Sequence, residues 1–192
     1  MGKYNYLPIF LLTGFMALSQ ARPEREHRIL KSQFPTLVTD HLDLRTEIKK
    51  LRYFKTVDST ETTYTRKFKK DRLYYHIDYD GSGNLIGSGF RVKEVDIPSD
   101  TYAMIQQYLQ GNYERYKIRR MWQLYPAGLS LPGEDALKNT FQNLIRPDNL
   151  YKVMVRDKSL GKRMDYELWF DATGGFKQMR YALPANHDRV LY

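Results

Sequence analysis

The residues whose spacing comes nearest to a ligand set lie between positions 78 and 84. Four oxygen-bearing side chains stand two residues apart there, as in the first half of a calcium-binding loop: Asp78, Asp80, Ser82 and Asn84. The twelfth position of such a loop needs a bidentate glutamate, but here it is Gly89, and the flanking segments have strand rather than helix patterns. Because Asp, Gly and Ser also dominate tight turns, the sequence predicts a hairpin turn and no metal site.

Histidine and serine, the other residues that could do chemistry, form no catalytic pattern. The histidines are not near one another at metal-ligand spacing: His27, His41, His76 and His187. Ser82 and Ser88 sit between glycines, but neither has the longer nucleophile-elbow pattern, and no glycine-rich stretch ends in the Gly-Lys-Ser/Thr of a phosphate loop. The sequence therefore predicts a protein that is not an enzyme, with no catalytic residues and no cofactor.

Aromatic and basic side chains at alternating strand positions are the best candidates for a binding surface. Where Tyr75, Ile118 and Leu168 face the core, their neighbours face the other side of the sheet. In the same register Trp122 faces the core and Gln123 the open side. That open side combines Trp, Tyr and Arg, which protein interfaces favour; the alternative is an ordinary solvated face with scattered aromatics. The candidate binding residues are Tyr74, His76, Arg115, Lys117, Arg119, Glu167 and Trp169.

The strands that carry these residues belong to a segment that occurs twice. Residues 75–85 and 166–176 both alternate aromatic or aliphatic residues with polar ones. Both runs then reach a turn of Asp, a small residue, a hydroxyl residue and Gly. A weaker match relates residues 48–51 to residues 118–121, each downstream of a Pro-led segment with helical spacing. The sequence thus predicts one hairpin, with its preceding elements, used twice.

The helices and strands follow from spacing and punctuation. Helices are expected from Phe34 and Pro35 to Leu42 and from Pro98 to Gly111, because proline opens and glycine ends a helix. Residues 126–148 insert a loop and a short amphipathic helix, which is typical of a lid on the core. The predicted fold is α+β, with two tandem helix-plus-antiparallel-meander repeats in one sheet and the helices on one face. The strands are expected over 64–68, 73–79, 116–124 and 164–170.

The first 21 residues have the order of a secretory signal. Lys3 precedes an apolar run over 7–18, and small residues end the segment at Ala21. The run is shorter than the roughly 20 apolar residues of a membrane span, so we expect a periplasmic or secreted protein without a transmembrane segment in the mature chain. The chain contains no cysteine, which leaves stability to core packing. The expected units are a signal peptide over 1–21, a first repeat over 22–96 and a second over 97–192.

The charge of the chain is positive but dispersed. It has 31 Lys and Arg against 22 Asp and Glu, a formal net charge of +9. Such an excess suits an anionic surface or an acidic protein, yet acidic residues are interspersed throughout, as in ordinary solubility charge. The longest basic cluster, over 66–72, surrounds a predicted hairpin turn. Nucleic acid is not an expected partner.

The order of these elements resembles PepSY-like domains. The likeness rests on the Phe34-Pro35 start, on residues 63–69 and on the strand that runs into residues 80–85. It is strongest over 34–125 and 151–181. The chain looks most like the exported, duplicated PepSY-like proteins of Bacteroidetes, which are grouped with the beta-lactamase-inhibitor-protein-like fold. The resemblance implies two alpha-beta repeats in one sheet, with helices against one face and no catalytic residues.

The resemblance also implies a class of function. Related domains, among them protease propeptide modules and a protein inhibitor of beta-lactamases, present a surface to a protein partner. We therefore expect an exported, non-enzymatic binding module that recognises a protein through its open sheet face. The alternative is a binder of anionic cell-envelope polymers through the basic strands, using charge more than shape.

Overall fold

The structure is a computed structural model. It describes residues 25–40, 42, 47–57, 61–128, 132–159, 164–182 and 185–191. The expected signal peptide over 1–21 lies outside these ranges, as do His41 and the side chain of His187. Within the described ranges, no helix has the length and apolar character needed to cross a membrane.

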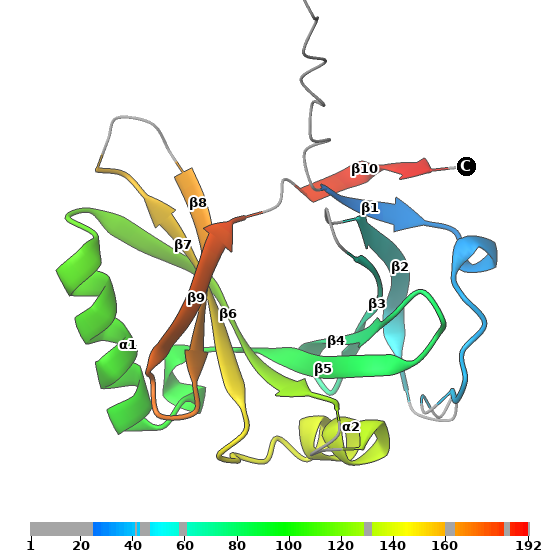
Figure 1. Ribbon diagram of the computed structural model, residues 1–192, viewed down its shortest axis with the longest axis horizontal. Helices are drawn as coiled ribbons and strands as arrows, with labels where there is room; N and C mark the ends of the chain where they lie inside the picture. The colour runs from blue at the N-terminus through cyan, green and yellow to red at the C-terminus, as the bar shows by residue number, and fades with distance from the viewer. Residues whose placement is uncertain are drawn as a thin grey trace, which may run out of the picture.

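Ten strands form one sheet, in the order β10-β1-β2-β3-β4-β5-β6-β7-β8-β9. Neighbouring strands are antiparallel, except that β1 and β10 are parallel. Figure 1 shows that the sheet is strongly curved and that both α-helices lie on its convex side. The strands are β1 (Arg25–Ile29), β2 (Lys49–Val57), β3 (Thr62–Lys70), β4 (Leu73–Tyr79), β5 (Leu85–Val92), β6 (Tyr116–Pro126), β7 (Leu150–Asp157), β8 (Met164–Asp171), β9 (Phe176–Tyr181) and β10 (Ala185–Leu191).

Two α-helices cover the convex side: α1 (Ser99–Asn112) and α2 (Gly133–Phe141). Each begins directly after a proline, Pro98 at φ −51° and Pro132 at φ −55°, which is the backbone angle that a helix start requires. Two 3-10 turns, η1 (Lys31–Gln33) and η2 (Glu94–Asp96), complete the helical elements of the described residues. The helix expected after Pro98 and the helix of the 126–148 insertion are confirmed.

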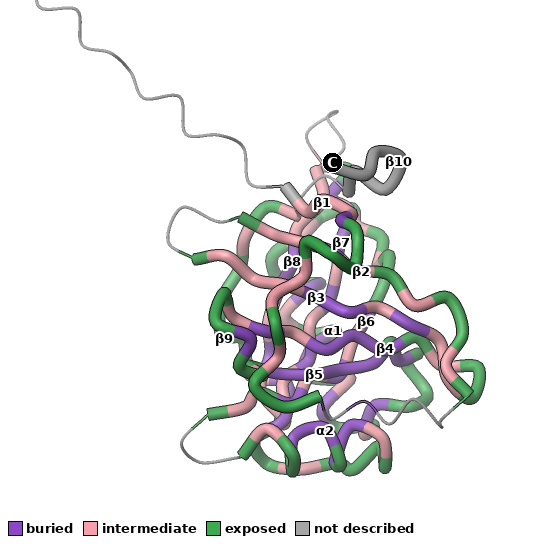
Figure 2. Tube along the Cα trace, turned by 90° about the vertical axis from the view of Figure 1, so that its right-hand side faces the viewer, coloured by how far each residue is buried: buried purple, intermediate pink, exposed green. Residues whose placement is uncertain are grey.

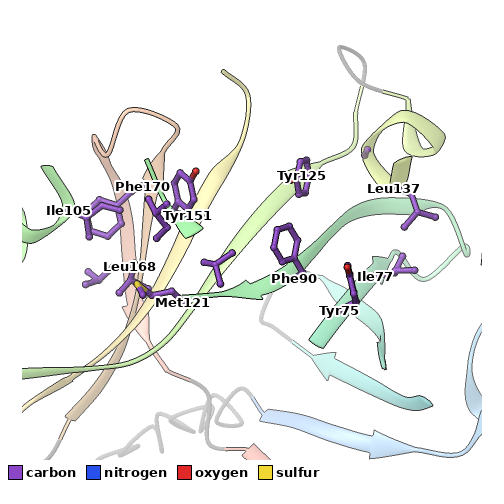
Figure 3. Close-up of a cluster of buried hydrophobic side chains, with 14 of the residues drawn as sticks. Tyr75, Ile77, Phe90, Ile105, Met121, Tyr125, Leu137, Tyr151, Leu168 and Phe170 are labelled. Atoms are coloured by element: carbon purple, nitrogen blue, oxygen red, sulfur yellow. The ribbon is translucent and has the colours of Figure 1, made fainter. Parts of the chain in front are cut away.

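The hydrophobic core lies between the helices and the convex side of the sheet (Figure 3). Ile105 of α1 is fully buried in it, together with Leu168 and Phe170 of β8. Tyr75 and Ile77 of β4 are also buried, so the expected registers of β4 and β8 are confirmed. Figure 2 shows buried residues along the central strands and exposed ones in many of the turns. Each large apolar side chain buried in this way contributes about 1.5–3 kcal/mol.

The two predicted hairpin turns have the same hydrogen bonds. Asp80 Oδ1 accepts from the amides two and four residues further on, at 2.8 and 2.9 Å. Asp171 Oδ1 does the same at 3.0 and 2.9 Å. Asp78, the other acid of the calcium-like pattern, faces the opposite way, because its Oδ1 accepts from Thr65 Oγ1 on β3 at 2.7 Å. The prediction of a hairpin turn is confirmed.

The helix expected over 34–42 is wrong for the residues described there. Residues 34–40 contain no helix, because Pro35 disfavours helical backbone at Phe34 and Phe34 is extended, at φ −81° and ψ 141°. The Val38 amide donates to the Gly83 carbonyl at 3.2 Å, which docks the segment on the β4–β5 turn. With two α-helices on a ten-stranded sheet the fold is mostly β, and two helix-plus-meander repeats are not confirmed.

A buried arginine holds this extended segment in place. Arg66 of β3 donates two hydrogen bonds to the Asp40 carboxylate, at 2.7 and 3.2 Å. Its guanidinium carbon lies 5.4–5.9 Å from the ring centroids of Phe34, Tyr53 and Tyr79. Arg66 is only 7% exposed, although the carboxylate that it binds is nearly half-exposed. The 34–40 segment is therefore held against β3 by cation–π contacts and an ion pair, whereas α1 is held on the sheet by apolar packing.

Candidate binding groove

The concave side of the sheet carries a groove with a volume of about 450 Å³. Its lining comes from strands along nearly the whole sheet, from Glu26 on β1 to Arg180 on β9. Most of these residues alternate along the strands with the core residues, so they point away from the helices. The open sheet face that the sequence predicts is therefore the hollow side of a curved sheet.

A row of aromatic and basic side chains crosses one half of the groove. Trp122 on β6 stands opposite Lys152 on β7, which stands opposite Trp169 on β8. The Lys152 ammonium lies 4.9 Å from the Trp122 ring centroid and 6.0 Å from that of Trp169. Within the described part of the chain, Lys152 forms no ion pair. Two indole rings thus hold a cation whose charge is available to a partner.

An ion pair extends this row toward the edge of the sheet. Arg180 on β9 donates two hydrogen bonds to Glu167 Oε2 on β8, at 2.8 and 3.0 Å. The Arg180 guanidinium carbon also lies 4.9 Å from the Trp169 ring centroid. Trp169 therefore packs between two cations, which fixes its ring on the floor of the groove. We call Trp122, Lys152, Trp169 and Arg180 the tryptophan row.

The other half of the groove contains a buried histidine. His76 on β4 is 8% exposed and stands opposite Gly89 on β5, where a Cβ would come within 2.8 Å of its ring. Burial lowers the pKa of His76 to about 4, against a smaller opposing effect of Asp78. His76 Nε2 lies 3.6 Å from Asp78 Oδ2. At neutral pH this side chain is therefore uncharged and forms a buried part of the groove lining.

An ion pair lies in the lining at the β1 side of the groove. The Lys67 ammonium on β3 pairs with the Glu26 carboxylate on β1, and it lies 4.4 Å from the Phe54 ring centroid on β2. Counted over the lining, with His76 neutral, the basic and acidic side chains are equal in number. The basic ones are Lys67, Arg120, Lys152 and Arg180, and the acidic ones are Glu26, Glu61, Asp78 and Glu167. The groove is therefore charged but electrically balanced.

A β-bulge corrects the predicted register of β6. Ile118 pairs with Val155 but Arg120 pairs with Met154, so Arg119 is an extra residue. Beyond the bulge the two faces exchange. Gln123, expected on the open face, is 2% exposed on the core side, and Trp122, expected in the core, lies in the groove.

The structure brings together three of the seven predicted binding residues. His76, Glu167 and Trp169 line the groove. Tyr74 and Arg119 line a separate hollow, described below. Arg115 and Lys117 line neither cavity; Arg115 directly precedes β6 and Lys117 is its second residue. The seven residues therefore do not form one site.

Sequence reasoning missed Lys152 and Arg180, which complete the row. The signal for Lys152 was available, because residues 150–157 alternate and bury Tyr151, Val153 and Val155. Arg180 gave no such signal, since β9 has a mostly exposed pattern. Among the described residues, no group of three or more His, Cys, Asp or Glu is placed to hold a metal ion.

Comparisons with known proteins return only structural similarities. No protein-family model matches the chain, and no curated protein does. A DUF2874 family protein from Bacteroides uniformis is 11% identical, with a TM-score of 0.46, over 70% of this chain and 79% of that one. A presumed periplasmic protein from Bacteroides eggerthii is 6% identical, with a TM-score of 0.48, over 73% and 83%.

A third similar structure is a BLIP-like protein from Bacteroides fragilis, which is 9% identical. Its TM-score is 0.44, over 74% of this chain and 81% of that one. At these identities and scores, the similarities define neither the fold nor the function of this chain. The resemblance to PepSY-like domains stays a prediction from the sequence.

Proposed function

We propose that the chain is an exported, non-enzymatic module that binds a protein partner through the concave groove. The tryptophan row is the observation that carries this proposal. Tryptophan and arginine are the residues most enriched among interface hot spots, and such hot spots lie in concave, well-packed positions. Trp122 and Trp169 are partly buried and fixed by cations, so a partner would meet a preorganised surface.

The charge balance of the groove favours a protein over an anionic polymer. A site for a polyanion needs a continuous excess of positive charge, whereas two of the four basic groups in this groove already pair with carboxylates. Paired charges of both signs instead favour a partner surface that also carries both signs. The alternative of an anionic envelope polymer has no support from the groove itself.

The test uses the mature chain as bait in envelope extract from its own host. Trp169→Ala should weaken binding of the captured protein by about 2 kcal/mol, roughly a 30-fold loss of affinity, measured by titration calorimetry. Tyr181→Ala is the matched control, because Tyr181 is an exposed aromatic residue that lies outside the groove. Equal losses in both variants would contradict the assignment of the groove, and circular dichroism checks that each variant is folded.

The export part of the proposal has its own test. Protein recovered from the host should begin at or near Arg22, because the charged, apolar and small-residue order of 1–21 is that of a cleavable signal. Amino-terminal sequencing of soluble cytoplasmic protein that finds Met1 would overturn the localisation.

A further inference from the structure

A second hollow lies at one end of strands β4, β5 and β6. Its volume is about 660 Å³, and five basic side chains and two acidic ones contribute to its lining. We propose that this arginine hollow binds a phosphate-bearing ligand, independently of the protein-binding groove. The basic residues are Arg72, Arg91, Lys93, Arg119 and Arg120, of which only Arg120 also lines the groove.

Both acidic residues of the hollow already accept hydrogen bonds from neighbouring groups. Glu94 Oε2 accepts a hydrogen bond from the Tyr102 hydroxyl at 3.1 Å. Asp96 Oδ2 accepts from the Lys93 backbone amide at 2.7 Å. Neither carboxylate forms an ion pair with an arginine among the described residues. The hollow therefore keeps a local excess of three positive charges.

The arginines of the hollow differ from the paired arginines elsewhere. In the part of the chain that the structure describes, none of the four arginines of the hollow forms an ion pair, although Arg119 contributes to the lowered pKa of Asp165, whose main cause is Arg156. Guanidinium groups in proteins usually bind a carboxylate or a phosphate where one is available. The arginines that pair with carboxylates are Arg66, Arg146, Arg156 and Arg180.

Two irregular backbone features direct arginines into the hollow. Successive residues of a regular strand point to opposite faces, but the bulge at Arg119 lets both Arg119 and Arg120 line one cavity. The β3–β4 turn has positive φ at Asp71 (47°) and Arg72 (69°), where Asn-Gly is the common choice. The positive φ values are the ordinary geometry of a two-residue hairpin, whereas the bulge is the feature that lets two consecutive arginines line one cavity.

The size and rim of the hollow indicate the rest of the ligand. A volume near 660 Å³ is in the range of about 300–1,000 Å³ that is typical of organic ligands, and exceeds what a bare phosphate fills. Val95 and Tyr74, which are 80% and 48% exposed, lie at its lining. The chemistry is that of a phosphate ester, from either a soluble metabolite or a lipid headgroup.

The test measures binding of glycerol 3-phosphate by NMR, and binding to phosphatidylcholine vesicles with and without phosphatidic acid by sedimentation. The test variant is Arg91→Gln/Arg119→Gln, which leaves every residue that lines the groove unchanged. The matched control is Arg115→Gln/Lys117→Gln, which removes the same charge from β6 and its preceding residue outside both cavities. We expect amide shifts near residues 91–95 and 118–121, and a loss of about tenfold in affinity in the test variant only.

The two probes distinguish the source of the phosphate. Binding of glycerol 3-phosphate assigns the hollow to soluble phosphate esters, and binding of phosphatidic acid vesicles alone assigns it to lipid headgroups. No binding of either probe, or equal losses in the test and control variants, overturns the proposal. Because the groove is intact in the test variant, partner binding there is expected to be unchanged whichever way the phosphate test falls.

Discussion

The two hairpin turns of this chain are alike, but the elements that cover them are not. In both, a glycine with positive φ brings the turn against a backbone carbonyl: Gly83 (84°) against Thr36 and Gly174 (88°) against Thr101. Thr101 belongs to α1, whereas Thr36 belongs to the extended segment over 34–40. Both turns therefore lie against a backbone carbonyl, which an extended segment supplies in one case and a helix in the other.

The two elements that cover the turns, α1 and the 34–40 segment, are held on the sheet by different interactions. Helix α1 satisfies its own backbone and docks through buried Ile105 and Leu109. The 34–40 segment has no such internal bonding, and instead depends on the Arg66–Asp40 pair and on the Val38 amide. We therefore expect the 34–40 segment to open locally and α1 to open only with the whole fold.

A methyl group added at each glycine tests the difference between α1 and the 34–40 segment. A Cβ at Gly174 would lie 2.5 Å from the Thr101 carbonyl oxygen, and one at Gly83 would lie 2.2 Å from that of Thr36. Because α1 belongs to the core, Gly174→Ala should destabilise the whole fold by about 3 kcal/mol, measured by urea unfolding. Gly83→Ala, despite the closer contact, should cost less, because the segment can move away. Equal costs would contradict the distinction between the covers.

A second prediction concerns the pair that holds the extended cover. Arg66→Met removes the bond to Asp40 and should cost about 2 kcal/mol, less than a fully buried pair because the Asp40 side chain is 47% exposed. Hydrogen exchange at the Val38 amide should accelerate in this variant, while exchange in α1 stays slow. Arg156→Met is the control, because the Arg156 side chain is 27% exposed, against 8% for Arg66, and an exposed arginine contributes less through its ion pair. Unchanged exchange at Val38 would show that Arg66 does not hold the segment.

The third prediction concerns the contribution of His76 to stability, which is the smallest of the three effects at neutral pH. His76 and Glu167 lie on the concave side at equivalent positions before the two hairpin turns. The pKa of His76 is about 4 in the fold, below its ordinary 6.5. The unfolded chain therefore binds more protons between these values, so stability should fall as pH drops from 6.5 to about 4 and be unaffected above 6.5. His76→Gln should flatten that part of the curve of unfolding free energy against pH. A slope that persists unchanged in His76→Gln would assign it to other groups.

Local patterns in the sequence predict some parts of this molecule well and others not at all. Strand alternation and proline placement identify β4, β8 and α1, because each is determined by its own residues. The prediction of a helix over 34–40 fails because Arg66, which lies 26 residues beyond Asp40 in the chain, decides the conformation of this segment. The prediction of the groove residues fails in part for the same reason, because the groove depends on sheet curvature, on strand order and on one extra residue at Arg119. Non-local contacts of this kind leave no periodic trace.

The position of β10 has a consequence for how the chain folds. From β1 to β9, every strand pairs with the next one along the chain, so each pairing closes a modest loop. Only β10 returns to the far edge, and its parallel pairing with β1 brings together residues as distant as Glu26 and Ala185. Closing that loop costs the most chain entropy for one strand pair. We expect the nine-stranded meander to assemble by successive additions and the β1–β10 pair to form last, which makes it the slow step of folding and the first to open.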